Sequence, residues 1–351
     1  MRVVIVAAPL SARSGVYRST VELVEAARGR GLDWRALIGI RRDAAGTPPT
    51  ACDGITERQV NAHGVAVTAE IRHMAAPFLD EADIVITMVP QSDLAIASSR
   101  GHRPWRHVSW VRGLPWPARG EQSRPRSFLL RAAARWSLAR ADAVWATTPL
   151  LRDEISSVAR AVVVPAGTPH APRLHDGSDC GPLVFAGRLS PEKNPGMLIS
   201  LVRATGHPAV LHGDGPLATS LRHDAPADVS WAGWSDSRDV WRSTGIFICP
   251  SFREAFGRSA VEAASAGLPS ILSDRTGVAR QLIRDPDLAA RFVLPPTALD
   301  SWLAATDALI TSAPLRKRLS EHLSANARHL TTDASLDAAL CAATELRRRN
   351  A

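Results

Sequence analysis

Short apolar segments alternate with helical patterns along almost the whole of this 351-residue chain, and this alternation limits the fold more than any other feature. Strand–helix–strand repeats are typical of parallel sheets whose crossover helices cover the sheet faces. The two clearest helices are expected at Val16–Arg30 and Ser127–Ala141. In the first half, strands are expected at Arg2–Ala8, Trp34–Ile40, Gly64–Thr68, Ile84–Val89, His107–Val111, Ala143–Thr147 and Ala161–Val164. In the second half, strands are expected at Leu183–Ala186, Ala209–His212, Val229–Trp231, Gly245–Cys249, Ser270–Leu272 and Phe292–Leu294.

A passage rich in proline and glycine interrupts the alternation near mid-chain. It occupies Pro165–Pro172 and Asp176–Pro182 and has no apolar periodicity, which is typical of an interdomain linker. A chain of this length is also expected to divide into two domains. We therefore predict an N-terminal domain at 1–168, a second domain at 169–333 and a terminal helix at 334–351 that packs back toward the first domain. The linker is expected to be a hinge.

Two carboxylates flank a predicted turn in the second half. Glu254 precedes Phe256 and Gly257, and Glu262 lies in a helix expected at Ser259–Ala266. A helix that opens after glycine presents free backbone N–H groups and the positive end of its dipole, which suits a phosphate. Both carboxylates are expected to border one cleft. Taken alone, however, the pair also fits two solvated glutamates on an ordinary amphipathic helix.

Four neighbouring segments decide between these interpretations. Phe185–Asn194 contains a strand, a Gly-Arg turn and a Glu-Lys-Asn sequence. His212–Pro216 has the sequence His-Gly-Asp-Gly-Pro, a Gly-acid-Gly-Pro turn that follows a histidine. Val229–Trp234 is a strand that reaches a glycine, and Ile248–Ser251 leads through Pro-Ser into the paired carboxylates. In this order, the segments resemble the retaining glycosyltransferases of family 4, and the resemblance covers most of the C-terminal half.

This resemblance implies an α/β GT-B architecture, in which two Rossmann-like parallel-sheet domains face a central cleft. It implies that Arg188 and Lys193 bind the diphosphate of a nucleotide sugar, Glu254 the transferred sugar and Glu262 the ribose. It also implies a retaining reaction that needs no metal and no cofactor beyond the donor. Further donor contacts are expected from Gly213, Trp234, Phe256, Gly257 and Arg258.

The N-terminal half departs from the family pattern. Ser14 and Gly15 stand where a Gly-Gly turn is common, and both are expected to approach the substrate. Arg112 stands where many members have a histidine; because arginine is not a base at neutral pH, we expect it to bind the acceptor. Trp105, Trp110 and Trp116 fit an acceptor wall and core packing equally well.

The net charge of +8 and the pI of about 10.4 invite an alternative, a basic protein that binds nucleic acid or a membrane. The positive charge is spread along the chain, and Lys193 and Lys317 are the only lysines. A helix within Arg124–Arg140 has an arginine face that fits an anionic membrane. We favour a crossover helix there, because Phe128 and Leu138 border that face.

Four scattered cysteines without metal-ligand spacing favour a reducing, cytoplasmic setting. No apolar run approaches the length needed to span a bilayer. Asp285 and Asp287 have the spacing of a cation motif, but the intervening proline indicates a turn, so no metal site is expected. No Gly-x-Gly-x-x-Gly follows the first strand, which argues against a nicotinamide-dependent dehydrogenase.

Together these observations predict a hexosyl-type, retaining glycosyltransferase that moves a sugar from a UDP-sugar to a hydroxyl of a small soluble acceptor, such as a sugar, cyclitol or natural product. An aminocyclitol would require an opposing charge from Asp93 or Glu121. Three alternatives stay open: a lipid-linked or polysaccharide acceptor, a UDP-sugar epimerase on the same fold, and the basic nucleic-acid or membrane-binding protein.

Overall fold

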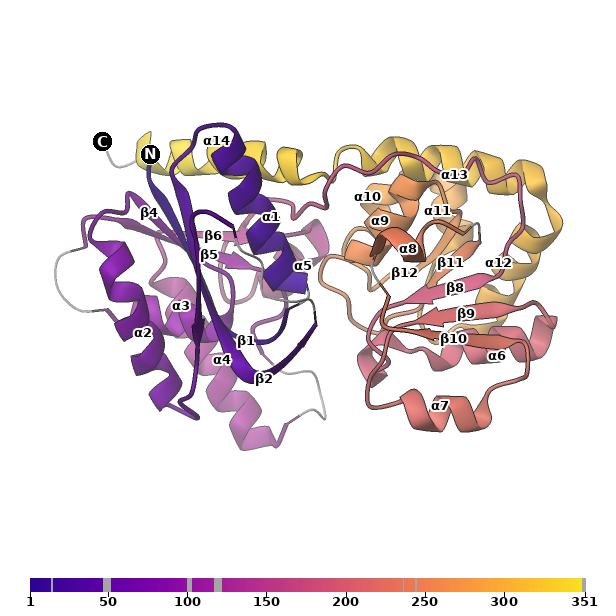
Figure 1. Cartoon of the computed structure of the whole chain (residues 1–351), viewed down its shortest axis with the longest axis horizontal. Helices are drawn as coiled ribbons and strands as arrows, with labels where there is room; N and C mark the ends of the chain where they lie inside the picture. The colour runs from indigo at the N-terminus through magenta and orange to yellow at the C-terminus, as the bar shows by residue number, and fades with distance from the viewer. Residues whose placement is uncertain are drawn as a thin grey trace. The chain divides into compact units, whose positions relative to one another are not determined.

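The computed structural model describes residues 1–13, 15–46, 52–99, 103–116, 122–235, 237–243 and 245–348. The chain divides into two compact units, of which unit 1 comprises Met1–Pro169 with Thr332–Ala351, and unit 2 comprises His170–Thr331. Each unit contains a parallel sheet with helices packed on it (Figure 1). The predicted α/β class with two Rossmann-like domains is therefore confirmed.

The sheet of unit 1 has seven strands in the order β3-β2-β1-β4-β5-β6-β7. The order reverses between β1 and β4, because the chain first adds strands on one side of β1 and then on the other. The strands are β1 (Val3–Arg13), β2 (Trp34–Gly46), β3 (Ile55–Gln59), β4 (Ile84–Thr87), β5 (Arg106–Val111), β6 (Ala143–Ala146) and β7 (Val162–Val163). The helices are α1 (Gly15–Gly29), α2 (Ala66–Leu79), α3 (Pro90–Ala97), α4 (Arg124–Ala139), α5 (Pro149–Ile155) and α14 (Thr332–Arg348).

Alternate residues of β1 supply two separate cores. Val3 and Ile5 join a cluster with α1 and α14, whereas Val4 and Val6 join a cluster with α2 and α3. Successive side chains of a strand point to opposite faces, so a strand covered on both faces needs an unbroken apolar run. This requirement explains the Val-Val-Ile-Val-Ala-Ala sequence at the start of the chain.

Helix α14 packs on α1 within unit 1, as Figure 1 shows. Leu336 and Ala339 of α14 are fully buried in the shared core. Arg30, just after α1, donates to Asp333 at 2.6 Å and to Asp337 at 2.5 Å. The last helical segment of the chain therefore belongs to the first unit.

The predicted strand at Gly64–Thr68 is wrong, because α2 begins within it. Val67, Ile71 and Ala75 are buried at intervals of four residues, the spacing of one helix face. The third strand is instead β3, which has the polar sequence Ile-Thr-Glu-Arg-Gln and lies at the sheet edge. An edge strand with little buried surface lacks the apolar pattern by which strands are recognised.

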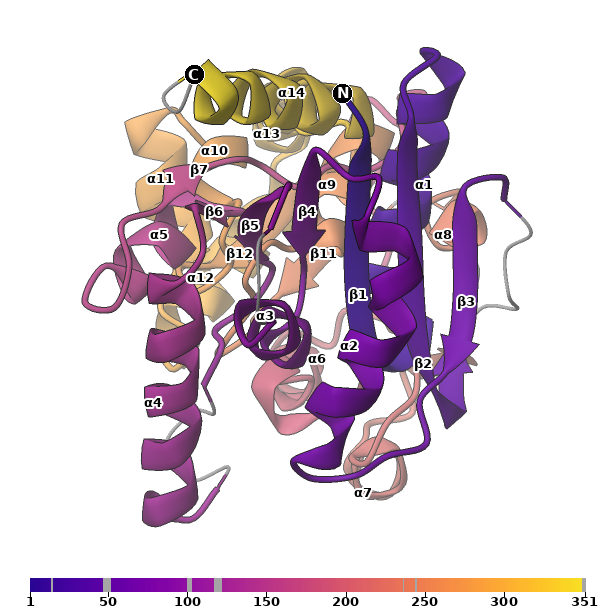
Figure 2. The same cartoon turned by 90° about the vertical axis from the view of Figure 1, so that its left-hand side faces the viewer.

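Helix α4 joins the parallel neighbours β5 and β6, so the predicted crossover helix is confirmed. Leu138 is buried, but Phe128 and Leu129 are 73% and 65% exposed. The N-terminal end of α4 extends beyond α3 in Figure 2. Phe128 therefore borders the arginine face without being buried, and this end of α4 presents apolar side chains to solvent.

The sheet of unit 2 has six parallel strands in the order β10-β9-β8-β11-β12-β13, so its order reverses between β8 and β11. Every residue of β11 and β12 is buried, as expected for central strands covered on both faces. The strands are β8 (Leu183–Ala186), β9 (Ala209–His212), β10 (Val229–Gly233), β11 (Ile246–Cys249), β12 (Ser270–Ser273) and β13 (Val293–Leu294). The helices are η1 (Pro191–Lys193, a 3-10 turn), α6 (Gly196–Thr205), α7 (Ala218–Asp224), α8 (Ser237–Val240), α9 (Arg258–Ala266), α10 (Ala279–Leu282), α11 (Pro286–Phe292), α12 (Leu299–Thr311) and α13 (Ala313–Ala327).

Candidate functional site

Three loops at the carboxyl ends of β8, β9 and β10 are joined by backbone hydrogen bonds. Gly187 N donates to His212 O at 3.0 Å, and Leu189 N donates to Asp214 O at 2.9 Å. Gly213 N donates to the carbonyl of Gly233, at the end of β10. Open α/β sheets bind ligands at the carboxyl edge where the strand order reverses, and the loop after β8 adjoins that point.

Gly213 allows this close packing. Its φ of 133° lies where residues with a side chain are strained, and an added Cβ would lie 1.9 Å from the carbonyl oxygen of Gly187. The loops after β8 and β9 therefore require glycine at this position. Trp234 follows the third loop and is 59% exposed, so its ring is available for contact with a ligand.

Arg188 and Lys193 follow β8 and differ in their surroundings. Arg188 is exposed, and its guanidinium makes no hydrogen bond or ion pair with the residues that the structure describes. Lys193 closes the 3-10 turn η1, and its Nζ contacts Glu254 Oε2. The side chains of Lys193 and Glu254 are only 25% and 18% exposed, so this ion pair is largely removed from water.

The pKa of Lys193 reflects two opposing effects. Burial by itself lowers the pKa of an ammonium group, but the charge of the Glu254 carboxylate and its hydrogen bond raise it more. The pKa of Lys193 therefore lies above its ordinary value, and the side chain carries a positive charge at neutral pH.

The backbone around the pair is fixed by contacts that the sequence does not reveal. Asn194 adopts a left-handed conformation with a φ of 52°, and its Nδ2 lies 3.2 Å from both Pro250 O and Pro296 O. The carbonyl of Glu192 accepts from Phe252 N at 2.9 Å. Asn194 thus joins the turn after β8 to the loops after β11 and β13.

Glu254 is held by the loop after β12. It forms an isolated parallel bridge with Thr276, and its carbonyl accepts from Gly277 N at 2.8 Å. Two residues on, the carbonyl of the buried Phe256 accepts from Val278 N at 3.0 Å. These bonds fix the backbone that carries the Glu254 carboxylate toward Lys193.

Helix α9 begins at Gly257, as the sequence predicted. Gly257 has a φ of 103°, and an added Cβ would lie 2.7 Å from Thr276 Cγ2. Gly257, the N-cap residue, has no side chain that could cap this helix end. The N-terminus of α9 carries the positive end of the helix dipole, which favours an anion such as a phosphate.

Glu262, one turn into α9, contacts two donors of unit 2. Arg258 Nη2 lies 3.4 Å from Glu262 Oε1, and Trp241 Nε1 lies 3.3 Å from Glu262 Oε2. Both Arg258 and Glu262 have side chains that are 14% exposed. The structure therefore joins Arg258 and Glu262 in an ion pair on α9.

The predicted residues of unit 1 lie near the start of α1. Ser14 is outside the described residues, and Gly15 opens α1 with a φ of 35°. Arg112 follows β5, donates to Ser19 Oγ at 2.8 Å and lies 4.8 Å from the centre of the Trp110 ring. Arg112 is therefore anchored against the first turns of α1.

Two of the three tryptophans near Arg112 serve the core. Trp110 is fully buried and Trp105 is 6% exposed, so packing explains both of them. Trp116 is half-buried, and the guanidinium of Arg131 stacks over its ring at 4.8 Å. Of the three, only Trp116 has surface that fits an acceptor wall.

Asp93 cannot supply a charge to an acceptor, as the sequence suggested it might for an aminocyclitol. Its side chain is buried and accepts from Ser109 Oγ at 2.7 Å and from the Thr87 hydroxyl. Burial raises the pKa of Asp93 to about 6, although these hydrogen bonds oppose the shift. His107 Nε2 lies 2.9 Å from Thr87 Oγ1, and burial, followed by the charge of Arg103, lowers the pKa of His107 to about 4.

The Asp285–Asp287 turn is a helix cap. Asp285 Oδ1 accepts from the backbone N–H groups of Asp287 and Leu288 at 2.9 and 3.0 Å, and Arg318 Nη2 lies 3.0 Å from Asp285 Oδ2. Across the part of the chain that the structure describes, no group of three or more His, Cys, Asp or Glu side chains is arranged to hold a metal.

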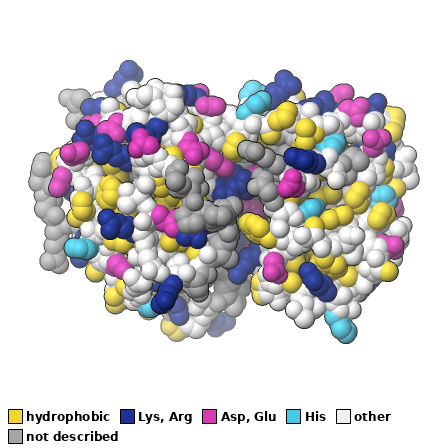
Figure 3. All heavy atoms as spheres, in the orientation of Figure 1, with side chains coloured by type: hydrophobic (Ala, Val, Ile, Leu, Met, Phe, Trp, Pro, Cys, Tyr) yellow, Lys and Arg dark blue, Asp and Glu magenta, His cyan; other side chains and the backbone are white. Residues whose placement is uncertain are grey.

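On the face of the molecule drawn in Figure 3, the basic side chains do not form one continuous patch. Lys and Arg side chains are spread over both units there, with Asp and Glu between them. Among the described helices, none combines the length and apolar character that crossing a membrane requires.

The part of the chain that matches a known family model lies within unit 2. Residues 181–326 match the family model described as Glycosyl transferases group 1. No curated protein sequence matches the chain significantly.

Solved structures resemble the chain over nearly its whole length at low identity. Sucrose-phosphate synthase from Thermosynechococcus elongatus has a TM-score of 0.82 at 15% identity, with 100% of both chains covered. The Anabaena HepE protein in complex with UDP and glucose has a TM-score of 0.75 at 15% identity, covering 98% of this chain and 100% of that one. The lipopolysaccharide outer core galactosyltransferase WaaB has a TM-score of 0.74 at 16% identity, covering 98% and 99%. The expected GT-B fold is confirmed.

Proposed function

We propose that this protein, whose residues 181–326 match the model of the glycosyl transferases group 1, transfers a hexose from a UDP-sugar to an acceptor hydroxyl with retention of configuration. One observation carries the proposal. The ion pair of Lys193 and Glu254 lies where the loops after β8 and β11 meet, and Glu254 precedes the N-terminus of α9 by a few residues. This arrangement offers a cation, a carboxylate and the positive end of a helix dipole at the edge where the strand order reverses.

The cations and amides act on the leaving group. As the bond between the anomeric carbon and the phosphate oxygen breaks, negative charge grows on the β-phosphate. Arg188 offers a guanidinium fork, Lys193 an ammonium group and α9 its first amides, and such positioned donors stabilise developing charge strongly. With these donors present, the reaction needs neither a metal nor another cofactor.

The carboxylates orient the donor. Glu254 accepts hydrogen bonds from hydroxyls of the transferred sugar, and Glu262 accepts from the ribose once it exchanges its present donors for them. The acceptor oxygen attacks the face from which UDP leaves, a new bond forms between it and the anomeric carbon, and its proton passes to a β-phosphate oxygen. Retention follows because attack and departure share one face.

Relatives support UDP as the nucleotide. The HepE structure is described as a complex with UDP and glucose, and its chain is covered completely by this fold. We extend this to the present protein as a proposal, with Trp234 and Gly213 beside the base. The four free cysteines favour a reducing compartment, and we place the reaction in the cytoplasm.

A small water-soluble acceptor is the first candidate, with Arg112 binding it. A lipid-linked acceptor is the second, and a specific observation favours it: Phe128 and Leu129 of α4 are exposed beside Arg131 and Arg135. Apolar and cationic side chains on one exposed helix suit the surface of an anionic membrane.

A thermal-shift screen with UDP-, GDP-, ADP- and dTDP-sugars tests the donor, because a ligand that binds the native state raises the melting temperature. UDP-sugars should give the largest shift, and stabilisation by another nucleotide alone would reject the assignment. Incubation of the UDP-sugar without acceptor tests for epimerase activity, and no epimer should form. Activity with water-soluble acceptors in the absence of lipid and detergent should separate the first acceptor candidate from the second.

A further inference from the structure

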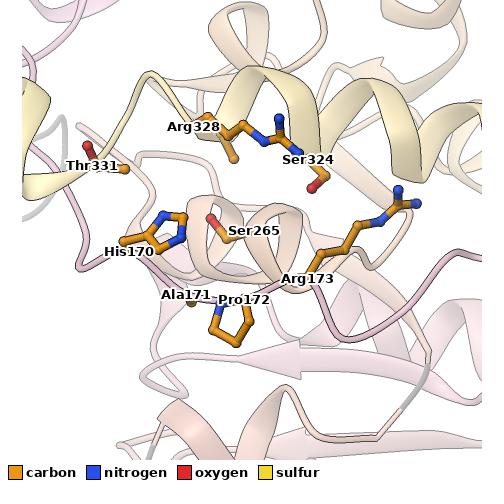
Figure 4. A pocket seen from close by; sticks show the side chains of 9 residues that line it. His170, Ala171, Pro172, Arg173, Ser265, Ser324, Arg328 and Thr331 are labelled. Carbon is orange, nitrogen blue, oxygen red and sulfur yellow. The ribbon is translucent and has the colours of Figure 1, made fainter.

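A cavity of about 190 Å³ lies in unit 2, on the side of α9 that carries Ser265 (Figure 4). None of the candidate site residues lines it. The lining residues come from the linker, from α9 and from α13 with the residues that follow it, and are His170, Ala171, Pro172, Arg173, Ser265, Ser324, Ala327, Arg328 and Thr331.

The polar lining favours an anion. Arg173 and Arg328 supply guanidinium groups, His170 a ring nitrogen, and Ser265 and Ser324 hydroxyls, while no carboxylate is among the lining residues. Figure 4 shows the Arg328 side chain extending along α13 toward Ser324. Guanidinium and hydroxyl donors around a space of this size match the oxygens of a phosphate group.

The linker wall of the cavity is fixed to α9 and α13. Arg173 Nη2 donates to Ser320 Oγ at 2.9 Å, and Arg173 Nε donates to His175 O at 2.8 Å. The amides of Leu174 and His175 both donate to Ala266 O at 2.9 Å. The donors of the cavity therefore stand on backbone that is already ordered, which reduces the entropy lost on binding.

The cavity lies beside both points at which the chain enters and leaves unit 2. His170 and Thr331 are the first and last residues of unit 2, so the chain passes between the units next to the cavity both times. Helix α9 connects Ser265 to Gly257 at the opposite end of the helix. A ligand here would contact both crossing points and the helix that carries Glu262.

We propose that this cavity binds the phosphate group of a small phosphorylated molecule or free phosphate, at a site separate from the donor site. Arg328 provides the main charge, His170 and the two serine hydroxyls donate to the remaining oxygens, and Arg173 holds the wall. This proposal goes beyond the glycosyl transfer proposed above and does not depend on it.

Calorimetric titration with inorganic phosphate and with glucose 6-phosphate tests the site. All proteins carry Arg188→Ala, so that phosphate binding by the donor site is weakened. In this background, Arg328→Gln combined with His170→Gln should lower phosphate affinity about tenfold or more, the effect expected from losing a charge-assisted hydrogen bond. Tighter binding of glucose 6-phosphate would identify a phosphorylated metabolite as the source, and tighter binding of inorganic phosphate would identify free phosphate.

Arg318→Gln is the matched control, because it removes one exposed arginine from the same helix outside the cavity. It should leave the affinity within about twofold. Ser324→Ala removes one donor without changing the charge and should lower affinity by a smaller factor. An affinity that does not respond to the Arg328 and His170 changes, or that falls equally with Arg318→Gln, would overturn the proposal.

Discussion

The two units share a strand order but carry different chemistry at the carboxyl edges of their sheets. In both, the order reverses beside the first strand, between β1 and β4 in unit 1 and between β8 and β11 in unit 2. Unit 2 places the partly exposed Lys193–Glu254 pair near its reversal point, whereas unit 1 buries Asp93, Thr87 and His107 within the fold. The two sheets therefore share a topology, and the side chains at and near their edges differ in charge and burial.

The largest expected effect tests whether unit 2 carries the reaction. Glu254→Gln keeps the size and part of the hydrogen bonding of the side chain but removes its charge, so turnover should fall at least about a hundredfold. Initial rates at saturating UDP-sugar measure this effect, with a urea melt to check the fold. Glu262→Gln is the matched control on α9, and it should chiefly raise the Michaelis constant for the donor. Near-normal turnover in Glu254→Gln would remove the reaction from this pair.

The two cations should have equal catalytic effects and unequal effects on stability. Arg188→Ala and Lys193→Ala should each lower turnover about a hundredfold, as expected for losing a positioned donor to the developing charge. Because Lys193 holds the half-buried Glu254 and Arg188 is exposed, only Lys193→Ala should also lower the free energy of unfolding, by about 1 kcal/mol. Turnover and urea denaturation of both variants provide the comparison. Equal losses of stability would contradict the assigned difference between them.

The close packing of the loops in unit 2 is the next target. Gly213→Ala should lower the free energy of unfolding by about 2–4 kcal/mol, because its Cβ would lie 1.9 Å from Gly187 O at a strained φ. Gly196→Ala is the control, since an added Cβ there meets nothing within 4 Å. Thermal and urea denaturation measure both variants. A Gly213→Ala variant as stable as wild type would show that the loops rearrange at little cost.

These residues also explain what the sequence could predict. The turn at Gly213 and the start of α9 at Gly257 need glycine for backbone reasons, so they leave short, recognisable motifs. The buried strands were found for a similar reason, since a strand covered on both faces must be apolar throughout. Features that depend on residues within one short segment can therefore be predicted from a single sequence.

Contacts between distant segments were not predictable. The bonds from Asn194 to Pro250 and Pro296 join loops far apart in the chain, and no local pattern marks them. The edge strand β3 has no apolar pattern because little of it is buried, and nothing in the local sequence shows that Asp93 is buried. In each case tertiary packing decided a property that local sequence leaves open.

Unit 1 should influence the acceptor more than the donor. Arg112→Ala should raise the Michaelis constant for the acceptor about tenfold, the effect of losing one charge-assisted hydrogen bond, and leave that for the donor nearly unchanged. Ser19→Ala is the control, because it removes the partner that holds the guanidinium and keeps the charge, so its effect should be smaller. A change confined to donor affinity in Arg112→Ala would contradict the division of labour between the units.

A pH-dependent effect is expected from the buried polar cluster of unit 1. The pKa of Asp93 is raised from 3.8 to about 6, so the folded state binds more protons than the unfolded state, and stability falls as pH rises through this window. The pKa of His107 is lowered from 6.5 to about 4, so stability falls as pH decreases from 6.5 toward 4. The two groups therefore act in opposite directions between about pH 4 and 6.

Asp93→Asn separates the two contributions, because Asn keeps an oxygen that accepts from Ser109 and Thr87 but cannot ionise. The stability of the variant relative to wild type should increase by about 2 kcal/mol between pH 4 and pH 7, since one pKa unit corresponds to about 1.4 kcal/mol. Urea denaturation at pH 4, 5, 6 and 7 measures the difference, with Asp228→Asn as a control for removing an exposed carboxylate. A difference that stays constant with pH would mean that Asp93 does not carry the buried charge, and the contrast between the two units would then rest on the catalytic variants alone.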